Sequence, residues 1–208
     1  MAFKVTDVIN ESMQGTKPSL FMASIDFPAL ISGGDKARER SRFLIKSTSL
    51  PASTLGMIEM PFMGRKIKIA GDRTFEDWET TIINDERMLM RSAIEKWSDG
   101  INGMQSNRSI FTDLNGTNGY RTSARVTQLA TNGAAIRTYE FHNIWPSSIA
   151  ALEVAWETVD TMSEFAVTWT YDFYTAANGT AGTAEGILQS LADDIGVSIR
   201  DLIETLAR

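Results

Sequence analysis

The sequence predicts a mainly β protein with two packed antiparallel sheets, a sandwich or barrel, flanked by one helix and followed by a C-terminal helical tail. Three observations support this prediction. Runs in which apolar and polar residues alternate recur along the chain, as in strands with one buried face. Turn-forming glycine and proline residues separate these runs, and only one internal segment has helical spacing. The 208 residues are enough for one core with appendages.

The clearest predicted strand lies at 165–173. Its Phe165, Val167, Trp169, Tyr171 and Phe173 alternate with smaller or polar residues. Burial of these five side chains contributes on the order of 10 kcal/mol before conformational entropy opposes it. Similar alternation predicts further strands at 20–27, from Phe43, at 54–62, 64–71, 77–82, 123–131, 134–142 and 151–157.

Two details refine these strands. Asn132-Gly133 separates two extended runs, and both residues tolerate the positive φ of a type I′ turn, so the pair predicts a hairpin. In the run at 64–71, Ile67 and Ile69 point to one face while Lys66 and Lys68 point to the other. This run therefore has one apolar face and one cationic face.

One internal helix is predicted after Asn84 or Asp85, either of which can cap it. Its apolar stripe is formed by Leu89, Met90, Ala93, Ile94 and Trp97, and we expect the stripe to pack on a sheet. Two polar segments, 28–41 and 100–119, have no periodicity and are predicted to be loops.

The predicted domain organisation has three parts. Residues 1–175 form the β domain, which begins with an N-terminal arm of about 18 residues. Residues 176–186 are small and polar, as in a linker. Apolar residues at three- and four-residue steps then predict an amphipathic C-terminal helix over 187–208, which needs a partner surface because an isolated helix of this length is marginal in water.

Composition argues against catalysis. The chain has no cysteine and one histidine, His142, which excludes thiol chemistry and leaves no histidine cluster for a metal. No nucleotide-binding, zinc-protease or calcium-loop motif is present. We therefore predict no catalytic residues, no metal and no cofactor. The acidic groups Asp72, Glu76, Asp77 and Asp193-Asp194 fit solvated faces, and His142 fits a structural or surface position.

Charge and targeting also narrow the function. The net charge of −6 argues against tight binding of nucleic acid, because that affinity depends on cations that neutralise phosphates. The first 15 residues lack the apolar core of a signal peptide, and no run approaches 18 apolar residues. We expect synthesis in the cytoplasm and no membrane segment.

One block carries a specific resemblance. Residues 61–97 read PFMGRKIKIAGDRTFEDWETTIINDERMLMRSAIEKW. This block closely resembles the tail tube proteins of contractile-tailed (myovirus-type) bacteriophages, from its Met-Gly-Arg-Lys-Ile start through Trp78 to the Asn84-Asp85-Glu86 step and the following helix. The segments at 46–53 and 143–156 are also similar to that family, and the resemblance runs in order from about 18 to 174.

The resemblance implies a structural protein of the virion tail, assembled in the host cytoplasm. In that family six copies form a ring, the inner sheets join into one barrel, and the rings stack into a tube inside the sheath. The implied partners are the tail sheath protein, the tape-measure protein, the baseplate tube initiator and the tail terminator. DNA passes through the lumen transiently during ejection, and an acidic wall would repel its phosphates.

Five residues of the block are candidate inter-subunit contacts: Arg65, Lys66, Lys68, Asp72 and Arg73. Their cations suit acidic patches on a neighbouring subunit, although for the lysines alone a solvated hairpin face is the favoured interpretation. For the C-terminal helix we expect packing on the outer surface of its own or a neighbouring subunit, or contact with the sheath.

Three other readings remain open. The chain could be the tube subunit of a non-viral contractile injection system, which would differ in cargo and not in fold. It could be a baseplate or tube-initiator protein, although these usually carry extra domains. It could also be a monomeric β-barrel binding module, which is a different functional class of protein.

Overall fold

The computed structural model describes residues 16–152, 154–156 and 161–178. The contacts of the chain define two compact units, and each is described by itself. Within the described residues, the smaller unit contains 16–22, 126–138 and 176–178. The larger unit contains Ala23–Arg125 and Tyr139–Thr175.

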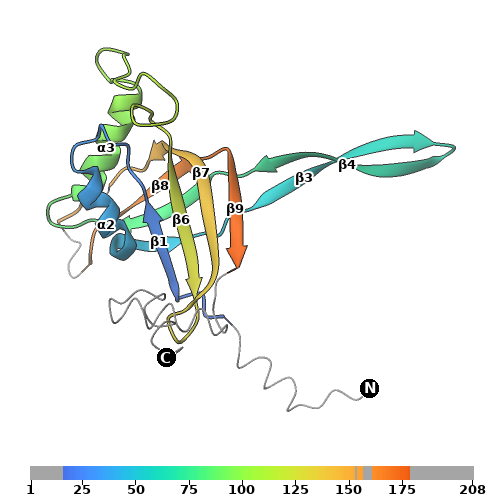
Figure 1. Ribbon diagram of the computed structural model, residues 1–208, viewed down its shortest axis with the longest axis horizontal. Helices are drawn as coiled ribbons and strands as arrows, with labels where there is room; N and C mark the ends of the chain where they lie inside the picture. Colours follow the sequence, from blue (N-terminus) through green and yellow to red (C-terminus); the bar gives the residue numbers. More distant parts are fainter. Residues whose placement is uncertain (1–15, 153, 157–160, 179–208) are drawn as a thin grey trace, which may run out of the picture. The chain divides into compact units, whose positions relative to one another are not determined.

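The mainly β prediction is confirmed. A seven-stranded sheet has the order β1-β6-β7-β8-β5-β2, with β9 also paired to β7 (Figure 1). Its strands are β1 Phe21–Ile25, β2 Ile45–Thr48, β5 Trp78–Ile83, β6 Thr122–Leu129, β7 Ala135–Ile149, β8 Glu164–Thr170 and β9 Phe173–Asn178. The second sheet is a two-stranded hairpin, β3 Ser53–Phe62 and β4 Arg65–Phe75.

The strand predicted at 165–173 is broken after Thr170 into β8 and β9. Tyr171 is buried, and the Asp172 backbone N–H still donates to His142 O of β7 at 3.2 Å. Asp172 Oδ2 accepts hydrogen bonds from Asn143 Nδ2 at 2.8 Å and Arg121 Nη1 at 3.0 Å. Asn143, within β7, lies in the left-handed region at φ 60°. Since β6 takes one edge of β7, β8 and β9 follow each other along the other edge.

Aromatic rings form the centre of the larger unit. The register places Trp78 opposite Trp169 on β5 and β8, and both are almost fully buried. The rings continue in both directions as an aromatic column with centroid separations of 4.5–6.3 Å: Phe27, Trp97, Trp169, Trp78, Phe141, Tyr171 and Phe75. Offset or edge-on contacts of this kind add to the stabilisation that burial alone provides.

The internal helix is confirmed as α3, Leu89–Ile101. Four residues of its predicted stripe, Met90, Ala93, Ile94 and Trp97, are buried. Asp85 supports the helix start, since its Oδ1 accepts the Leu89 backbone N–H at 2.8 Å. The stretch after α3 is irregular as predicted, with one isolated bridge between Asp113 and Gly119.

A second helix, α2 Gly34–Leu44, occupies most of the segment predicted to be a loop. Only small residues are buried on it, among them Ala37 and Ser41, so apolar periodicity gave no signal. Polar contacts fix the helix instead: Ile25 N–H donates to Ser41 Oγ at 3.2 Å, and Arg38 pairs with Asp26 at 2.7 Å. Phe43, expected to begin a strand, is an exposed residue of α2, and β2 begins at Ile45.

The strand predicted at 151–157 is also wrong. The preceding strand, expected to end at His142, continues as β7 through Trp145-Pro146 to Ile149, with a bulge after Pro146. The described residues that follow, including Val154 and Trp156, are not in a strand and are exposed. The alternating apolar residues of this segment are therefore not covered by the described part of the chain.

In the smaller unit, the hairpin predicted at Asn132-Gly133 is confirmed, but its turn is not type I′. Only Gly133 has a positive φ, 82°, and Ala130 N–H donates to Ala134 O at 2.8 Å across a three-residue loop. This is the common arrangement in which a tight turn ends in a left-handed glycine. Thr127 and Thr138 bond across the two strands at 3.1 Å.

The remaining predictions concern the ends of the chain. Residues 176–178, expected at the start of the linker, continue β9. The rest of the linker, the C-terminal helix and residues 1–15 of the arm lie outside the described residues. Neither α2 nor α3 has the length and apolar character needed to cross a membrane.

Candidate subunit interface

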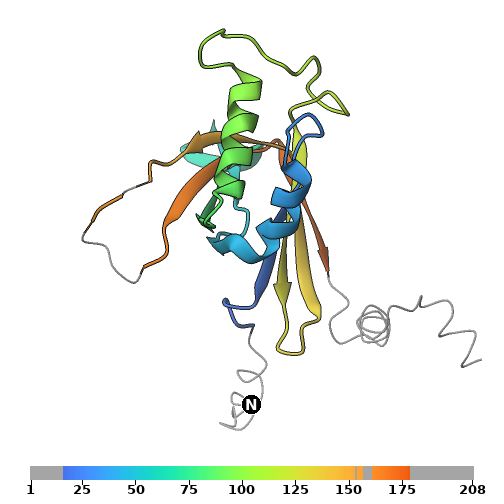
Figure 2. The same ribbon diagram turned by 90° about the vertical axis from the view of Figure 1, so that its left-hand side faces the viewer.

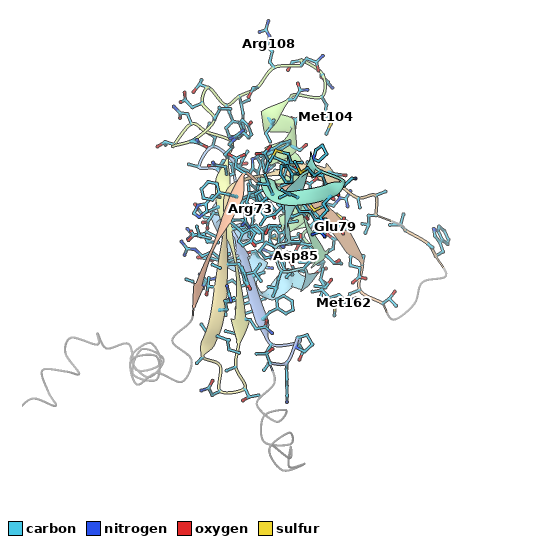
Figure 3. All side chains as sticks on the ribbon, turned by 90° about the vertical axis from the view of Figure 1, so that its right-hand side faces the viewer. Arg73, Glu79, Asp85, Met104, Arg108 and Met162 are labelled. Carbon is cyan, nitrogen blue, oxygen red and sulfur yellow. The ribbon has the colours of Figure 1, made fainter. Side chains whose placement is uncertain are left out.

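The β3–β4 hairpin is the most exposed element of the larger unit. It extends away from the seven-stranded sheet as a long twisted ribbon (Figure 1), and Figure 3 views the unit from the side on which it projects. Ser53, Gly71 and Phe75 are half-buried, and every other hairpin residue is exposed. An isolated two-stranded hairpin is marginally stable in water, so this length of exposed ribbon indicates a missing partner surface.

Cross-strand pairing divides the outer hairpin into two faces. Ile58 pairs with Ile69 and Met60 with Ile67, and Phe62 lies opposite Arg65 at the tip. Because paired residues share a face, five large apolar side chains form one continuous surface, here called the apolar face: Ile58, Met60, Phe62, Ile67 and Ile69. Each of these residues is 44–59% exposed.

The opposite face is polar. Glu59 pairs with Lys68 in the register, and Pro61 with Lys66. Lys66 Nζ forms an ion pair with Glu59 Oε2. The hairpin as a whole carries four cationic and two acidic residues, although the chain has a net charge of −6. The hairpin is therefore amphipathic and locally basic.

The tip is a two-residue turn. Met63 has φ 44° and Gly64 has φ 80°, the two positive values of a type I′ turn. A left-handed conformation costs a residue with a Cβ roughly 1–2 kcal/mol, and Met63 adopts it with its side chain 91% exposed. The hairpin thus presents an apolar side chain at its outermost point.

A bulge increases the twist midway along the hairpin. Leu55 pairs with Arg73 and Met57 with Ala70, so Gly56 alone lies opposite Gly71 and Asp72. A Cβ on Gly56 would come within 3.2 Å of Asp72 O, so glycine permits the close approach of the two backbones here.

The root of the hairpin is anchored in aromatic side chains. The Phe75 ring lies 6.0 Å from that of Tyr171 and 5.6 Å from that of Tyr174. Burial raises the pKa of Tyr171 to about 12, with smaller contributions from Tyr174 and Asp77. Tyr171 therefore stays neutral over the whole physiological range and acts as part of the apolar support.

All five predicted contact residues lie on β4 and are exposed. They do not form a single cluster. Lys66 and Lys68 share the polar face, Arg65 is beside the apolar face at the tip, and Asp72 is at the bulge. Arg73, labelled in Figure 3, is at the root, where its Nη1 donates to Ser53 Oγ at 2.9 Å.

Sequence reasoning overlooked the apolar residues of β3 as contact candidates. Met60 and Phe62 alternate with Glu59 and Pro61, and the same alternation occurs in β4. The signal was present, because an apolar face on both strands of one hairpin indicates a surface to be buried. Alternation does not say which chain buries it.

His142 has a structural role, and Asp193-Asp194 lie outside the described residues. His142 Nε2 lies 2.9 Å from Thr175 Oγ1, and its ring stacks on Phe173. Within the described residues, no group of three or more acidic or histidine side chains could hold a metal ion.

Comparisons with known proteins agree with this picture. The family model described as phage tail tube protein matches residues 16–177. The tail tube protein gp19 of Enterobacteria phage T4 is 30% identical over 165 residues, which cover 79% of this chain and 93% of gp19.

Two solved structures share the fold. The terminating cap of the anti-feeding prophage tube has a TM-score of 0.56 at 13% identity, over 86% of this chain and 95% of the cap chain. A chain of the 6-fold symmetrised anti-feeding prophage baseplate has a TM-score of 0.53 at 8% identity, over 79% and 96%. The chain belongs to the phage tail tube protein family and is a tube subunit of the virion tail.

Proposed function

We propose that this subunit assembles into six-membered rings, that the rings stack into a hollow tube, and that DNA passes through the lumen during ejection. The observation that carries this proposal is the apolar face of the β3–β4 hairpin. Six-fold symmetry is supported by the baseplate chain that shares the fold. The role is structural, with no catalytic step.

Burial of the apolar face against a second copy supplies the driving force. Full burial of one large aliphatic or aromatic side chain contributes about 1.5–3 kcal/mol, and five such side chains are about half exposed in the single chain. A soluble monomer rarely exposes a continuous apolar surface of this kind. Ring closure and stacking would remove both this surface and the open hairpin edges from water.

The polar face provides selectivity. Lys66 and Lys68 project from a protein with a net charge of −6, and we expect acidic residues of a neighbouring copy to face them. Charge complementarity of this kind orients the encounter and suppresses wrong registers more than it adds affinity. The five contact residues predicted from the sequence are retained as inter-subunit contacts in this proposal.

The remaining partners follow from the position of a tube in a tail. The outer surface contacts the sheath protein, and the lumen holds the tape-measure protein before DNA replaces it. The baseplate tube initiator and the tail terminator contact the two ends of the tube. The predicted helix at 187–208 packs on the outer surface or on the sheath, and deletion of 176–208 would then weaken tube stability or sheath attachment.

A double substitution, Ile67→Asp with Ile69→Asp, tests the proposal. Both side chains are exposed, so the thermal midpoint of the monomer should change little, because surface substitutions usually alter stability by under about 0.5 kcal/mol. Assembly should be lost, since two charges would be buried at the contact. Sedimentation and negative-stain microscopy measure assembly directly.

The matched control is Lys36→Asp with Glu39→Asp on the exposed side of α2, away from the hairpin. The control should assemble like the parent chain. Tubes of normal length and yield from the Ile67→Asp, Ile69→Asp variant would refute the role given to the hairpin.

A further inference from the structure

The segment between β7 and β8 carries a second exposed apolar group. Val154 is 85% exposed, Trp156 is fully exposed and Met162 is 79% exposed. A tryptophan with no covered surface is unusual, because its ring offers 150–250 Å² for burial and it is enriched at the centres of protein interfaces. These residues are not part of the hairpin.

A matching groove lies at the C-terminal end of α3. It has a volume of about 230 Å³ and is lined by Leu30, Ile31, Ser32, Lys96, Asp99, Gly100 and Ile110. The volume equals that of about eight water molecules in the bulk liquid, which is enough space to admit an indole ring. Leu30 and Ile110 expose apolar side chains at the opening, and Gly100 contributes no side chain.

The rim of the groove is polar and fixed. Lys96 Nζ donates to Ser32 Oγ at 3.2 Å. Asp99 is exposed, and its Oδ1 accepts the Met104 backbone N–H at 2.9 Å, which leaves Oδ2 available as an acceptor within the described residues. A buried indole N–H needs an acceptor, and this carboxylate oxygen would supply one.

The exposed group and the groove lie on opposite sides of α3 within the larger unit. Figure 2 shows residues 150–152, 154–156 and 161–163 on one side and the 26–33 turn, with the loop after α3, on the other. Figure 3, from the opposite direction, shows Met162 far from Met104, which lies in the loop after α3. Two complementary patches at different places on one chain generate head-to-tail contacts, which form a ring when the rotation between neighbours closes on itself.

We propose that Trp156 of one subunit inserts into the Leu30–Ile110 groove of the next subunit in the same ring. The inference rests on the proposed ring assembly and adds a lateral contact to the one made by the hairpin. The indole ring packs on Leu30 and Ile110, and its N–H donates to Asp99 Oδ2. The occupant of the groove is therefore a second copy of this chain.

Site-directed cross-linking tests this contact, because the chain has no cysteine of its own. The double variant Ala155→Cys, Ser32→Cys keeps Trp156 and places one thiol beside it and one on the groove rim, both at exposed positions. Assembled full-length protein is treated with a short bis-maleimide reagent and separated under denaturing conditions. A ladder of covalent multimers is expected, because each subunit contributes one thiol to each neighbour.

The control pair is Ala155→Cys with Glu79→Cys, since Glu79 is exposed on β5 away from the groove. Tubes that give no more cross-linking than this control would overturn the inference and leave the tube proposal intact. Dimers from Ala155→Cys alone would indicate a symmetric contact and also overturn it. Failure of the parent chain to form rings or tubes would overturn both proposals.

A single substitution gives a second measurement. Trp156→Ala should raise the concentration needed for assembly by roughly tenfold or more, as expected for an interface anchor, and leave the monomer's thermal midpoint unchanged. Met104→Ala, also highly exposed but outside the groove, should change neither value. An unchanged assembly concentration for Trp156→Ala would contradict the inference.

Discussion

The seven-stranded sheet and the β3–β4 hairpin have the same sequence pattern and opposite exposure. In β5 and β8, the alternating residues Trp78, Ile82 and Trp169 are covered by their own chain, partly by Trp97 of α3. In the hairpin, Ile67 and Ile69 alternate equally well but stay about half exposed. Alternation in these strands therefore identifies a face that is to be buried. It does not show whether the same chain or another subunit covers that face.

The largest effect should follow from damage to the sheet. Trp169→Ala removes a fully buried side chain at the centre of the aromatic column and should lower the free energy of unfolding by about 3–5 kcal/mol. Denaturant unfolding of the unassembled subunit measures this loss. A loss below about 1 kcal/mol would mean that the buried apolar side chains of the sheet contribute no more stability than the exposed ones of the hairpin.

Tyr171 at the hairpin root should show a pH effect. Its pKa is raised to about 12 in the folded chain, against about 10 when unfolded, so the folded state holds the proton more strongly. The stability that this provides is fully present below pH 10 and is lost as the pH rises toward 12. Thermal unfolding of the parent chain and of Tyr171→Phe across this range should show that only the parent loses stability this way.

The same variant has an expected result at neutral pH. Tyr171 Oη is buried with no hydrogen-bond partner among the described residues, so removal of the hydroxyl should be neutral or slightly stabilising. A loss of more than about 1 kcal/mol at pH 7 would indicate that the hydroxyl has a hydrogen-bond partner in the folded chain.

A smaller gain is expected at the hairpin tip. Met63→Asn should stabilise the hairpin by up to about 1 kcal/mol, because asparagine tolerates the positive φ that Met63 adopts. Hydrogen exchange of the β3 and β4 amides reports this locally. Weaker assembly in the same variant would show that the Met63 side chain contributes to the contact despite its strained backbone.

The smallest effect concerns the ion pair between Lys66 and Glu59. Both side chains are partly exposed, so Lys66→Ala should change the stability of the monomer by less than about 0.5 kcal/mol. If lysines on this face meet an acidic neighbour, the substitution should nevertheless reduce the salt dependence of tube assembly. Turbidity over a range of ionic strength tests this difference.

The parts predicted well from the sequence depend on local patterns. The apolar residues of α3 recur at helical spacing, and those around Trp78 and Trp169 alternate as in a strand. Gly133 indicates a hairpin whatever the type of its turn. The parts predicted poorly depend on contacts distant in sequence. Ser41 and Arg38 hold α2 through Ile25 and Asp26, and the last predicted strand divides where Asp172 bonds Asn143 and Arg121.

The candidate interface was predicted in part for the same reason. The basic residues of β4 were visible as a motif, whereas Met60 and Phe62 looked like residues of an ordinary buried face. Only the fold reveals that the described part of the chain leaves them uncovered. Trp156 is a similar case, since its alternation with Val154 predicted a strand and the structure places both residues in solvent.

The aromatic column also gives the larger unit a mechanical property. Phe75 at the hairpin root is linked to Trp97 of α3 by rings in sequential contact, without a polar gap. Close-packed side chains have low compressibility and transmit strain. A force on the hairpin should therefore be transmitted through the column and displace α3.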